Sequence, residues 1–228
     1  RKKPSTVSQP VQFNRLKQDV IFEFKKPHAR STVRHLLSLS SYQISYSNNT
    51  SGLECSDMQG LCVSKFSDPG YYVNKLTWSI LNNRLLNPYS LNLAIEQGDY
   101  FVKASLTGNY RFNYKSKGNG CSVRFFSGRF LYNDFPNANP RFGFFINGNG
   151  DYLYDHIFLG RGVENGILSN QFVYNDGGFK TDMSIAGSQS WLTALNIQTS
   201  LFPKLPVEMY ADLGWTSVDP TNILYGLG

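Results

Sequence analysis

The stretch DYFVKASLTGNYRFNYK, residues 99–115, has a strict period of two residues. From Tyr100 onward the even positions are apolar, aromatic or small, and from Lys103 onward the odd positions are polar or charged. Successive side chains of a β-strand point to opposite faces, so this pattern predicts one strand with an apolar face and a polar face.

The length of this strand is as informative as its alternation. The 17 residues of 99–115 would reach about 55 Å at about 3.3 Å per residue, whereas strands of globular proteins usually have about five or six residues. Tilted by about 45°, such a strand still crosses about 30 Å of hydrocarbon. The stretch therefore favours a strand that crosses a membrane.

Similar alternation recurs along the chain. It is clear in five further segments, namely 14–26, 72–82, 89–98, 191–201 and 207–215, and less regular in 31–46, 121–132, 141–159, 168–175 and 179–187. Turn-forming sequences occur at KGNG (117–120) and NDGG (175–178), between segments, and at NGNGD (147–151), within the irregular segment 141–159. We expect an all-β fold with roughly 12 strands, without helices, joined in sequence order as an antiparallel up-and-down sheet.

Composition separates the membrane classes. The longest apolar runs fall well short of the roughly 20 residues of a membrane-spanning helix, which excludes a helical membrane protein. Aromatic residues are 15% of the chain and charged residues 17%, a mixture that suits strands and turns. In hydrocarbon an open sheet would leave backbone amides unpaired. We therefore predict a transmembrane β-barrel, with 1–228 as its single domain.

Aromatic residues near the expected strand ends favour the barrel over a soluble sandwich, because such rings sit well at the headgroup level of a membrane. The predicted interface aromatics are Tyr72, Tyr89, Tyr110, Phe112, Tyr114, Trp191 and Trp215, with Phe130 and Tyr132. The predicted lumen-facing polar residues are Arg15, Lys17, Lys103, Arg111 and Lys115. The lipid bilayer is then the first partner of the chain.

Positive charge is concentrated at the start of the chain. The segment up to Arg34 contains nine Lys and Arg residues but only two acidic residues, Asp19 and Glu23, so its net charge is +7. The rest of the chain contains 13 basic and 14 acidic residues, a net charge of −1. This excess is interpreted as a solvated or lumen-facing stripe, or alternatively as a contact with anionic lipid headgroups. VRFFSGRF at 123–130 lacks the pattern of an RNA-recognition motif, so we expect no nucleic-acid partner.

Motifs for catalysis or cofactor binding are missing from the sequence. His28, His35 and His156 lie outside any HExxH or Cys/His metal spacing. Asp176 and Asp182 are interpreted as ordinary hairpin residues, with a hard-cation site as the alternative. No catalytic residue, metal ligand or cofactor is therefore predicted. Cys55 and Cys62 bracket a polar loop and are either a local disulfide or two free thiols.

Two segments carry a resemblance to a known family: NYRFNYKSKGNGCSVRFFSGRFLYN at 109–133, and 160–214 with its GILSNQF, DGGF, WLTALN and ADLG elements. In their order these elements resemble the C-terminal, strand-rich region of aminopeptidase-N-like (gluzincin) zinc metallopeptidases of Gram-negative bacteria. The likeness covers roughly residues 85 to 228. It implies an outer-membrane location and a membrane anchor or scaffold for an attached peptidase domain.

The resemblance carries over no catalytic residue, because the HExxH helix and the downstream glutamate of that family are not in this sequence. The opening RKKPSTV and the closing ILYGLG suggest a barrel that is incomplete at one or both ends and part of a longer polypeptide. Three functions are weighed: an anchor for a peptidase domain or a subunit of an outer-membrane complex, an outer-membrane pore, and a soluble β-rich ligand-binding domain.

Overall fold

The computed structural model describes residues 13–24, 28, 30–46, 52–56, 61–65, 70–114, 119–134, 142–147, 151–155, 176–181, 183, 187–200 and 207–228. At residues 46, 52–56 and 61–65 only the backbone is described.

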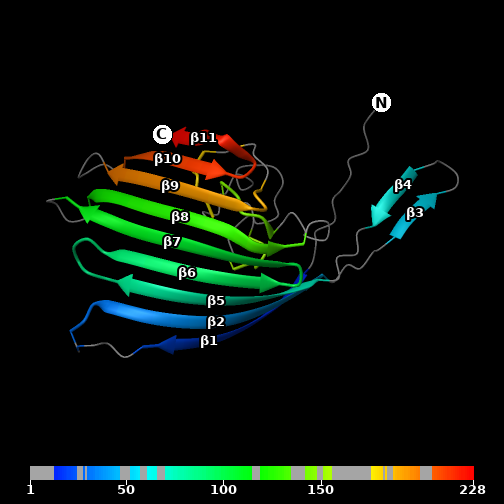
Figure 1. Ribbon diagram of the computed structural model, residues 1–228, viewed down its shortest axis with the longest axis horizontal. Helices are drawn as coiled ribbons and strands as arrows, with labels where there is room; N and C mark the ends of the chain where they lie inside the picture. The colour runs from blue at the N-terminus through cyan, green and yellow to red at the C-terminus, as the bar shows by residue number, and fades with distance from the viewer. Residues whose placement is uncertain are drawn as a thin grey trace.

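Nine strands form one sheet in which each strand pairs antiparallel with its neighbours, in the order β1-β2-β5-β6-β7-β8-β9-β10-β11 (Figure 1). The strands are β1 (Phe13–Glu23), β2 (Val33–Tyr46), β5 (Tyr71–Asn82), β6 (Tyr89–Gly98), β7 (Phe101–Asn113), β8 (Gly120–Asn133), β9 (Trp191–Ser200), β10 (Glu208–Thr216) and β11 (Asp219–Leu227). Between β2 and β5, a separate hairpin consists of β3 (Gly52–Ser56) and β4 (Leu61–Lys65).

The all-β class and the antiparallel up-and-down order predicted from the sequence are confirmed. In the part of the chain that the structure describes, the sheet has nine strands and is not closed: β1 and β11 form its two edges. Within the described part of the chain, no helix is long and apolar enough to span a membrane.

The two-residue period separates the sheet into two faces. Segments 142–147, 151–155 and 176–181, together with Ser188, contact the side of the sheet that carries Phe101 and Lys103, which we call the covered face. The opposite side carries Leu76, Leu93 and Ile95 and is called the bare face. Phe101 and Lys103 are 2% and 4% exposed, whereas Leu93 and Ile95 are each 39% exposed.

Two hydrophobic clusters hold the covering segments on the sheet. The first joins β2, β5 and β7 to loop residues and consists of Tyr42, Ile44, Tyr71, Val73, Phe101, Phe142, Tyr152 and Leu153. The second joins β8 and β9 to loop residues and consists of Phe126, Phe144, Ile146, Phe179, Leu192 and Ala194. The core therefore lies between the sheet and its own loops, on the covered face.

Two segments predicted as strands have a different role. Where 141–159 and 179–187 are described, they form turns and irregular backbone, with one isolated bridge between Phe144 and Ser188. The alternation of Phe142, Phe144 and Ile146 is real, but all three side chains are buried in the core and do not form a strand face. The strand expected at 168–175 lies outside the described residues.

A β-bulge explains one wrong assignment among the aromatics. The β7–β8 register shifts so that Val102 pairs with Tyr132 and Lys103 with Phe130. The extra residue turns Tyr132 to the exposed side, where it is 57% exposed. Phe130 instead packs against Phe101 and Phe144, so it belongs to the covered face and not to an exposed aromatic belt.

Candidate functional site

The bare face has an apolar surface across the width of the sheet. Its middle carries mainly aliphatic side chains: Val20, Leu39, Leu76, Leu91, Leu93, Ile95 and Leu213 are between 37% and 51% exposed. Register pairs such as Leu39–Leu76, Leu76–Ile95 and Leu195–Leu213 align these residues from strand to strand. Most of the surface seen on this side is therefore hydrocarbon.

Exposed aromatic residues lie toward both ends of this face. Tyr89 pairs with Tyr110 at one end, where Phe112 contacts Tyr110 edge to face and the Tyr114 hydroxyl lies 2.8 Å from Thr199 Oγ1. The other end has Tyr72 early in β5, Tyr132 late in β8, Trp191 at the start of β9 and Trp215 near the end of β10. Tyr72, Tyr110, Phe112, Tyr114 and Trp215 are at least 36% exposed, and Tyr89 and Trp191 are half-buried.

The separation of the two aromatic rows is measurable along β5. Tyr72 lies ten residues before Asn82, and Asn82 pairs with Tyr89. Ten residues extend about 33 Å, or about 23 Å along a membrane normal when the strand is tilted by about 45°. Transmembrane barrels have an apolar band about 25 Å tall between their aromatic girdles, so this spacing is of the size that a bilayer requires.

The covered face contains a network of buried charges centred on Glu96 of β6. Its carboxylate lies 2.9 Å from Lys75 Nζ and 3.5 Å from Lys103 Nζ, and it accepts a hydrogen bond from the Tyr152 hydroxyl. Lys103 also donates to the carbonyl oxygen of Phe142 at 3.1 Å. Because Lys75 and Lys103 flank Glu96 in register on β5 and β7, the sheet itself places these three charges side by side.

Tyr152 attaches a covering segment to this network. Its hydroxyl donates to Glu96 and its carbonyl oxygen accepts from the Tyr71 hydroxyl. Burial, reinforced by the Glu96 carboxylate, raises the pKa of Tyr152 well above its usual value. The hydroxyl thus stays protonated and remains a donor to the carboxylate.

The edge strand β1 is attached to the same segment by charge. Arg15 donates to the carbonyl oxygen of Leu153 at 2.8 Å and forms an ion pair with Asp155. Lys17 Nζ lies 3.0 Å from Asp19 and 3.6 Å from Asp155, and the Tyr42 hydroxyl donates to Asp155 at 2.9 Å. The first basic segment of the chain therefore reaches the covered face through Arg15 and Lys17.

A second network lies farther along the covered face. Arg124 of β8 donates to Asn196 Oδ1 at 2.9 Å and to the carbonyl oxygen of Asp176. Asn196 donates in turn to Asp212 Oδ1 at 3.0 Å, and Asp212 also accepts from the backbone N–H of Lys180 at 2.9 Å. These bonds hold the 176–181 segment over β8, β9 and β10.

Asp176 has a structural role in this network. Its side chain accepts a hydrogen bond from the backbone N–H of Phe145 at 2.9 Å, and burial raises the pKa of its carboxyl group. Asp182, with which it would form the alternative hard-cation site, lies outside the described residues. Among the residues that the structure describes, no group of three His, Cys, Asp or Glu could hold a metal ion.

Gly178 allows the covering loop to approach Arg124 closely. Its φ is +67°, and a Cβ atom there would lie 2.6 Å from Arg124 Nη1 and 3.1 Å from Asn196 Oδ1. We expect Gly178→Ala to destabilise the protein by about 1–2 kcal/mol, because an L-residue is strained at that φ. Guanidinium unfolding of detergent-folded protein measures the change.

A matched glycine variant separates this effect from a general cost of alanine. At Gly108, in the middle of β7, a Cβ atom would lie 3.7 Å from Leu91 Cδ1, which is an ordinary contact. Gly108→Ala is expected to be neutral or to stabilise, because glycine weakens a strand interior. Equal losses in both variants would show that the close approach of Gly178 has no energetic consequence.

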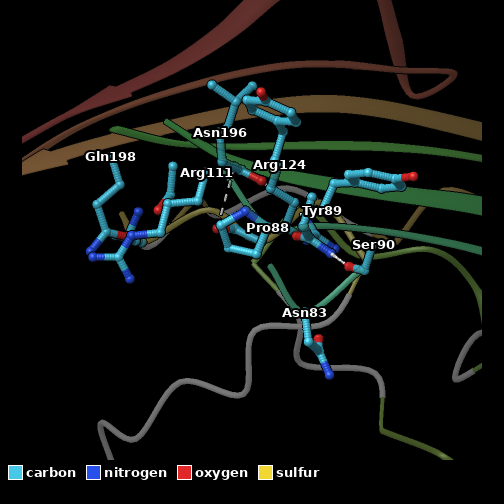
Figure 2. A pocket seen from close by; sticks show the side chains of 14 residues that line it. Asn83, Pro88, Tyr89, Ser90, Arg111, Arg124, Asn196 and Gln198 are labelled. Atoms are coloured by element: carbon cyan, nitrogen blue, oxygen red, sulfur yellow. Dashed lines mark hydrogen bonds between the residues drawn. The ribbon is translucent and has the colours of Figure 1, made fainter. Parts of the chain in front are cut away.

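Two cavities along the covered face are lined by charged residues of the described part of the chain. One, of about 390 Å³, lies over the Glu96 network and is lined by Lys75, Glu96, Lys103, Asp151, Asp155 and Asp176 among others. The other, of about 520 Å³, lies over the Arg124 end and is lined in part by Arg111, Arg124 and Lys180 (Figure 2). The first mixes both signs of charge, whereas the described residues that line the second are only cationic or neutral.

The five polar residues predicted to face the lumen fall into three groups. Arg15, Lys17 and Lys103 contact the covering segments. Arg111 is exposed and lines the larger cavity. Lys115 lies outside the described residues.

The remaining sequence candidates are scattered. His28 is exposed, His35 stacks on Trp78 with ring centroids 6.4 Å apart, and His156 lies outside the described residues. Cys55 and Cys62 are paired residues in the β3–β4 register. Only their backbone is described, so a disulfide and two free thiols both remain as alternatives.

Sequence reasoning missed Glu96, Tyr152 and Asp155 as members of the buried network. Glu96 was visible as a polar position of its strand, and its apposition to Lys75 and Lys103 follows once the register is known. Tyr152 and Asp155 had no signal, because they belong to a segment interpreted as a strand.

No protein-family model matches the chain, and no curated protein matches it.

Proposed function

We propose that this chain is a wall of an outer-membrane β-barrel that serves as a membrane anchor or scaffold. The observation that carries the proposal is the exposed apolar bare face with aromatic residues toward both ends. Soluble monomers rarely expose an apolar patch of more than a few hundred Å², whereas a lipid-facing barrel surface has this composition throughout.

The distribution of polarity argues against a soluble sandwich. In a sandwich the apolar face of the sheet packs on a second layer and the polar face meets water. Here the second layer consists of the chain's own loops, and it covers the face with Glu96, Lys103 and Arg124 while Leu76, Leu93 and Leu213 stay exposed. A lipid environment accounts for both faces at once.

An anchor is favoured over an open pore because the covering segments cross the polar face. Lys103, a cation expected to line the lumen, is 4% exposed and neutralised by Glu96. Segments 142–147, 151–155 and 176–181 attach to the sheet through both hydrophobic clusters and both charge networks. A conducting lumen would need this layer to move aside.

Membrane insertion requires the edges of β1 and β11 to be paired, because hydrocarbon offers no partner for free amides. In an antiparallel sheet of nine sequential strands, the first and last strands run in the same direction. Antiparallel closure therefore needs an odd number of additional strands. We propose that an odd number of additional antiparallel strands, paired with β1 and β11, completes the barrel.

The resemblance to the C-terminal region of aminopeptidase-N-like metallopeptidases suggests which domain the anchor would hold at the membrane. We propose an attached peptidase domain, or another subunit of an outer-membrane complex, as the partner. Any zinc chemistry would belong to that partner, because the described residues hold no suitable ligand cluster.

Flotation with lipid vesicles tests the membrane proposal. The intact protein, refolded in the presence of phosphatidylcholine vesicles, is expected to float with the lipid in a density gradient and to stay there after an alkaline wash. Recovery as a monodisperse protein without lipid or detergent would overturn the proposal and favour the soluble ligand-binding alternative.

Planar-bilayer recordings distinguish the anchor from the pore. We expect no steady conductance above the background of the bilayer, because the covering segments occupy the polar face. Reproducible open-channel steps, with anions preferred over cations, would instead support the pore alternative, in which Arg111 and Lys103 line the path.

A further inference from the structure

The larger cavity lies at the Arg124 end of the covered face and has a polar floor built by the sheet register. One row across it consists of Arg111, Ser122 and Gln198, which are consecutive partners on β7, β8 and β9. The next row consists of Asn109, Arg124 and Asn196, with Ser90 beyond Asn109. Side chains of neighbouring strands in such rows are about 5 Å apart, so these groups converge on one space.

The covering loop supplies the opposite wall. Gly178 and Lys180 line the cavity, and Asn196 donates to the carbonyl oxygen of Gly178 at 3.4 Å. Figure 2 shows the labelled Arg111, Arg124, Asn196 and Gln198 together on one side of this space, with Asn83 on the other. Sheet and loop thus form two walls of a cavity that is open to solvent, with Arg111 at an exposed position.

The charge of the lining is one-sided. Arg111, Arg124 and Lys180 contribute three cations, and no Asp or Glu is among the described residues that line the cavity. The carboxylates that neutralise part of this charge lie behind the wall. Asp212 is fully buried and its Oδ1 is 4.0 Å from Lys180 Nζ. The part of the lining that the structure describes is therefore cationic.

We propose that this cavity binds a phosphorylated sugar. Arginine and lysine are the usual protein groups for phosphate, because their N–H donors form charge-assisted hydrogen bonds with its oxygens. The amides of Asn109 and Gln198 and the hydroxyl of Ser122 suit the hydroxyl groups of a sugar ring. A volume of about 520 Å³ falls in the range of about 300–1,000 Å³ typical of small-molecule sites and exceeds what a bare inorganic anion fills.

The smaller cavity provides an internal contrast. It lies on the same face and also contains cations, but Glu96, Asp151, Asp155 and Asp176 line it as well. Its positive charges are already paired, as the contact of Lys75 with Glu96 at 2.9 Å illustrates. An anionic ligand would meet these carboxylates here, whereas none is among the described residues that line the larger cavity, so the Arg124 end is the better site for it. This inference goes beyond the proposed function and does not depend on it.

Isothermal titration calorimetry of the full chain in detergent, with glucose 6-phosphate as the probe, tests the site. We expect saturable binding of glucose 6-phosphate and none of glucose, and binding of inorganic phosphate weaker by about tenfold, because the sugar contacts are then lost. Absence of saturable binding, or equal affinity for glucose, would overturn the proposal. Equal affinity for inorganic phosphate would overturn the sugar part of it.

Variants locate the binding within the fold. Arg111→Gln and Lys180→Gln are each expected to weaken glucose 6-phosphate binding by about tenfold, the loss of one charge-assisted hydrogen bond. The matched control is Arg34→Gln, which removes an exposed cation from β2 and is expected to leave the affinity unchanged. Unchanged affinity in both cavity variants would overturn the assignment. Vesicle flotation of the same variants reports separately on the membrane proposal.

Discussion

Glu96→Gln is expected to destabilise the folded protein by about 3–5 kcal/mol, the usual cost of removing one partner from a buried charge network. The substitution keeps the volume of the side chain but leaves Lys103, which is 4% exposed, without its nearest carboxylate. It also removes the charged acceptor of the Tyr152 hydroxyl, which attaches the 151–155 segment. Guanidinium unfolding in detergent, followed by tryptophan fluorescence, measures the loss.

Two further variants test the origin of this loss. Glu23→Gln removes an exposed carboxylate whose ion pair with Arg34 spans 3.7 Å between half-exposed side chains, so a change below about 1 kcal/mol is expected. Adding Lys103→Met to Glu96→Gln is expected to recover part of the stability, because the uncompensated cation is removed as well. A loss below about 1 kcal/mol for Glu96→Gln alone would contradict a stabilising role of the network.

Leu93→Arg is expected to reduce stability in lipid vesicles by about 2–4 kcal/mol, the cost of an arginine on the lipid face at the bilayer midplane. Leu93 lies in the middle of the bare face, where it pairs with Trp78 and Leu106 in register and is 39% exposed. On a water-facing surface the same substitution would change stability by at most about 0.5 kcal/mol. The size of the effect therefore reports the solvent that this face meets.

The depth dependence of the arginine effect supplies the control. Tyr110→Arg places the same charge near the end of the strands, in the aromatic row with Tyr89. Its expected cost is about 0–1 kcal/mol, because an arginine near the interface reaches the headgroups. Equal effects of Leu93→Arg and Tyr110→Arg, measured by guanidinium unfolding in the same vesicles, would be incompatible with a bilayer across the bare face.

Local pattern was a good guide to the sheet. The alternation in 99–115 predicts β7 and both of its faces, and similar patterns locate β1, β5, β6, β9 and β10, because strand periodicity depends only on neighbouring residues. It failed at Phe142, Phe144 and Ile146, where the same alternation reflects insertion into a core. Hydrophobic periodicity indicates which side chains are buried together. It does not indicate whether the backbone forms hydrogen bonds with a neighbouring strand.

The candidate sites were less accessible to sequence reasoning. Glu96 and Tyr152 are 56 residues apart, and Arg124 and Asn196 are 72 apart, so each contact depends on how distant segments meet. The bulge between Val102 and Lys103 likewise turned Tyr132 to the exposed side while Phe130 stayed on the covered one. Such contacts carry no local signature in the chain.

The amino-acid sequence alone determined the class of this protein, its antiparallel order and the two-faced character of its strands, because hydrophobic alternation and turn residues act over a few positions. Only the tertiary structure decided which face is covered and which polar residues converge. That choice depends on where the loops between β8 and β9 pack, through buried aromatic clusters and ion pairs between residues far apart in the chain.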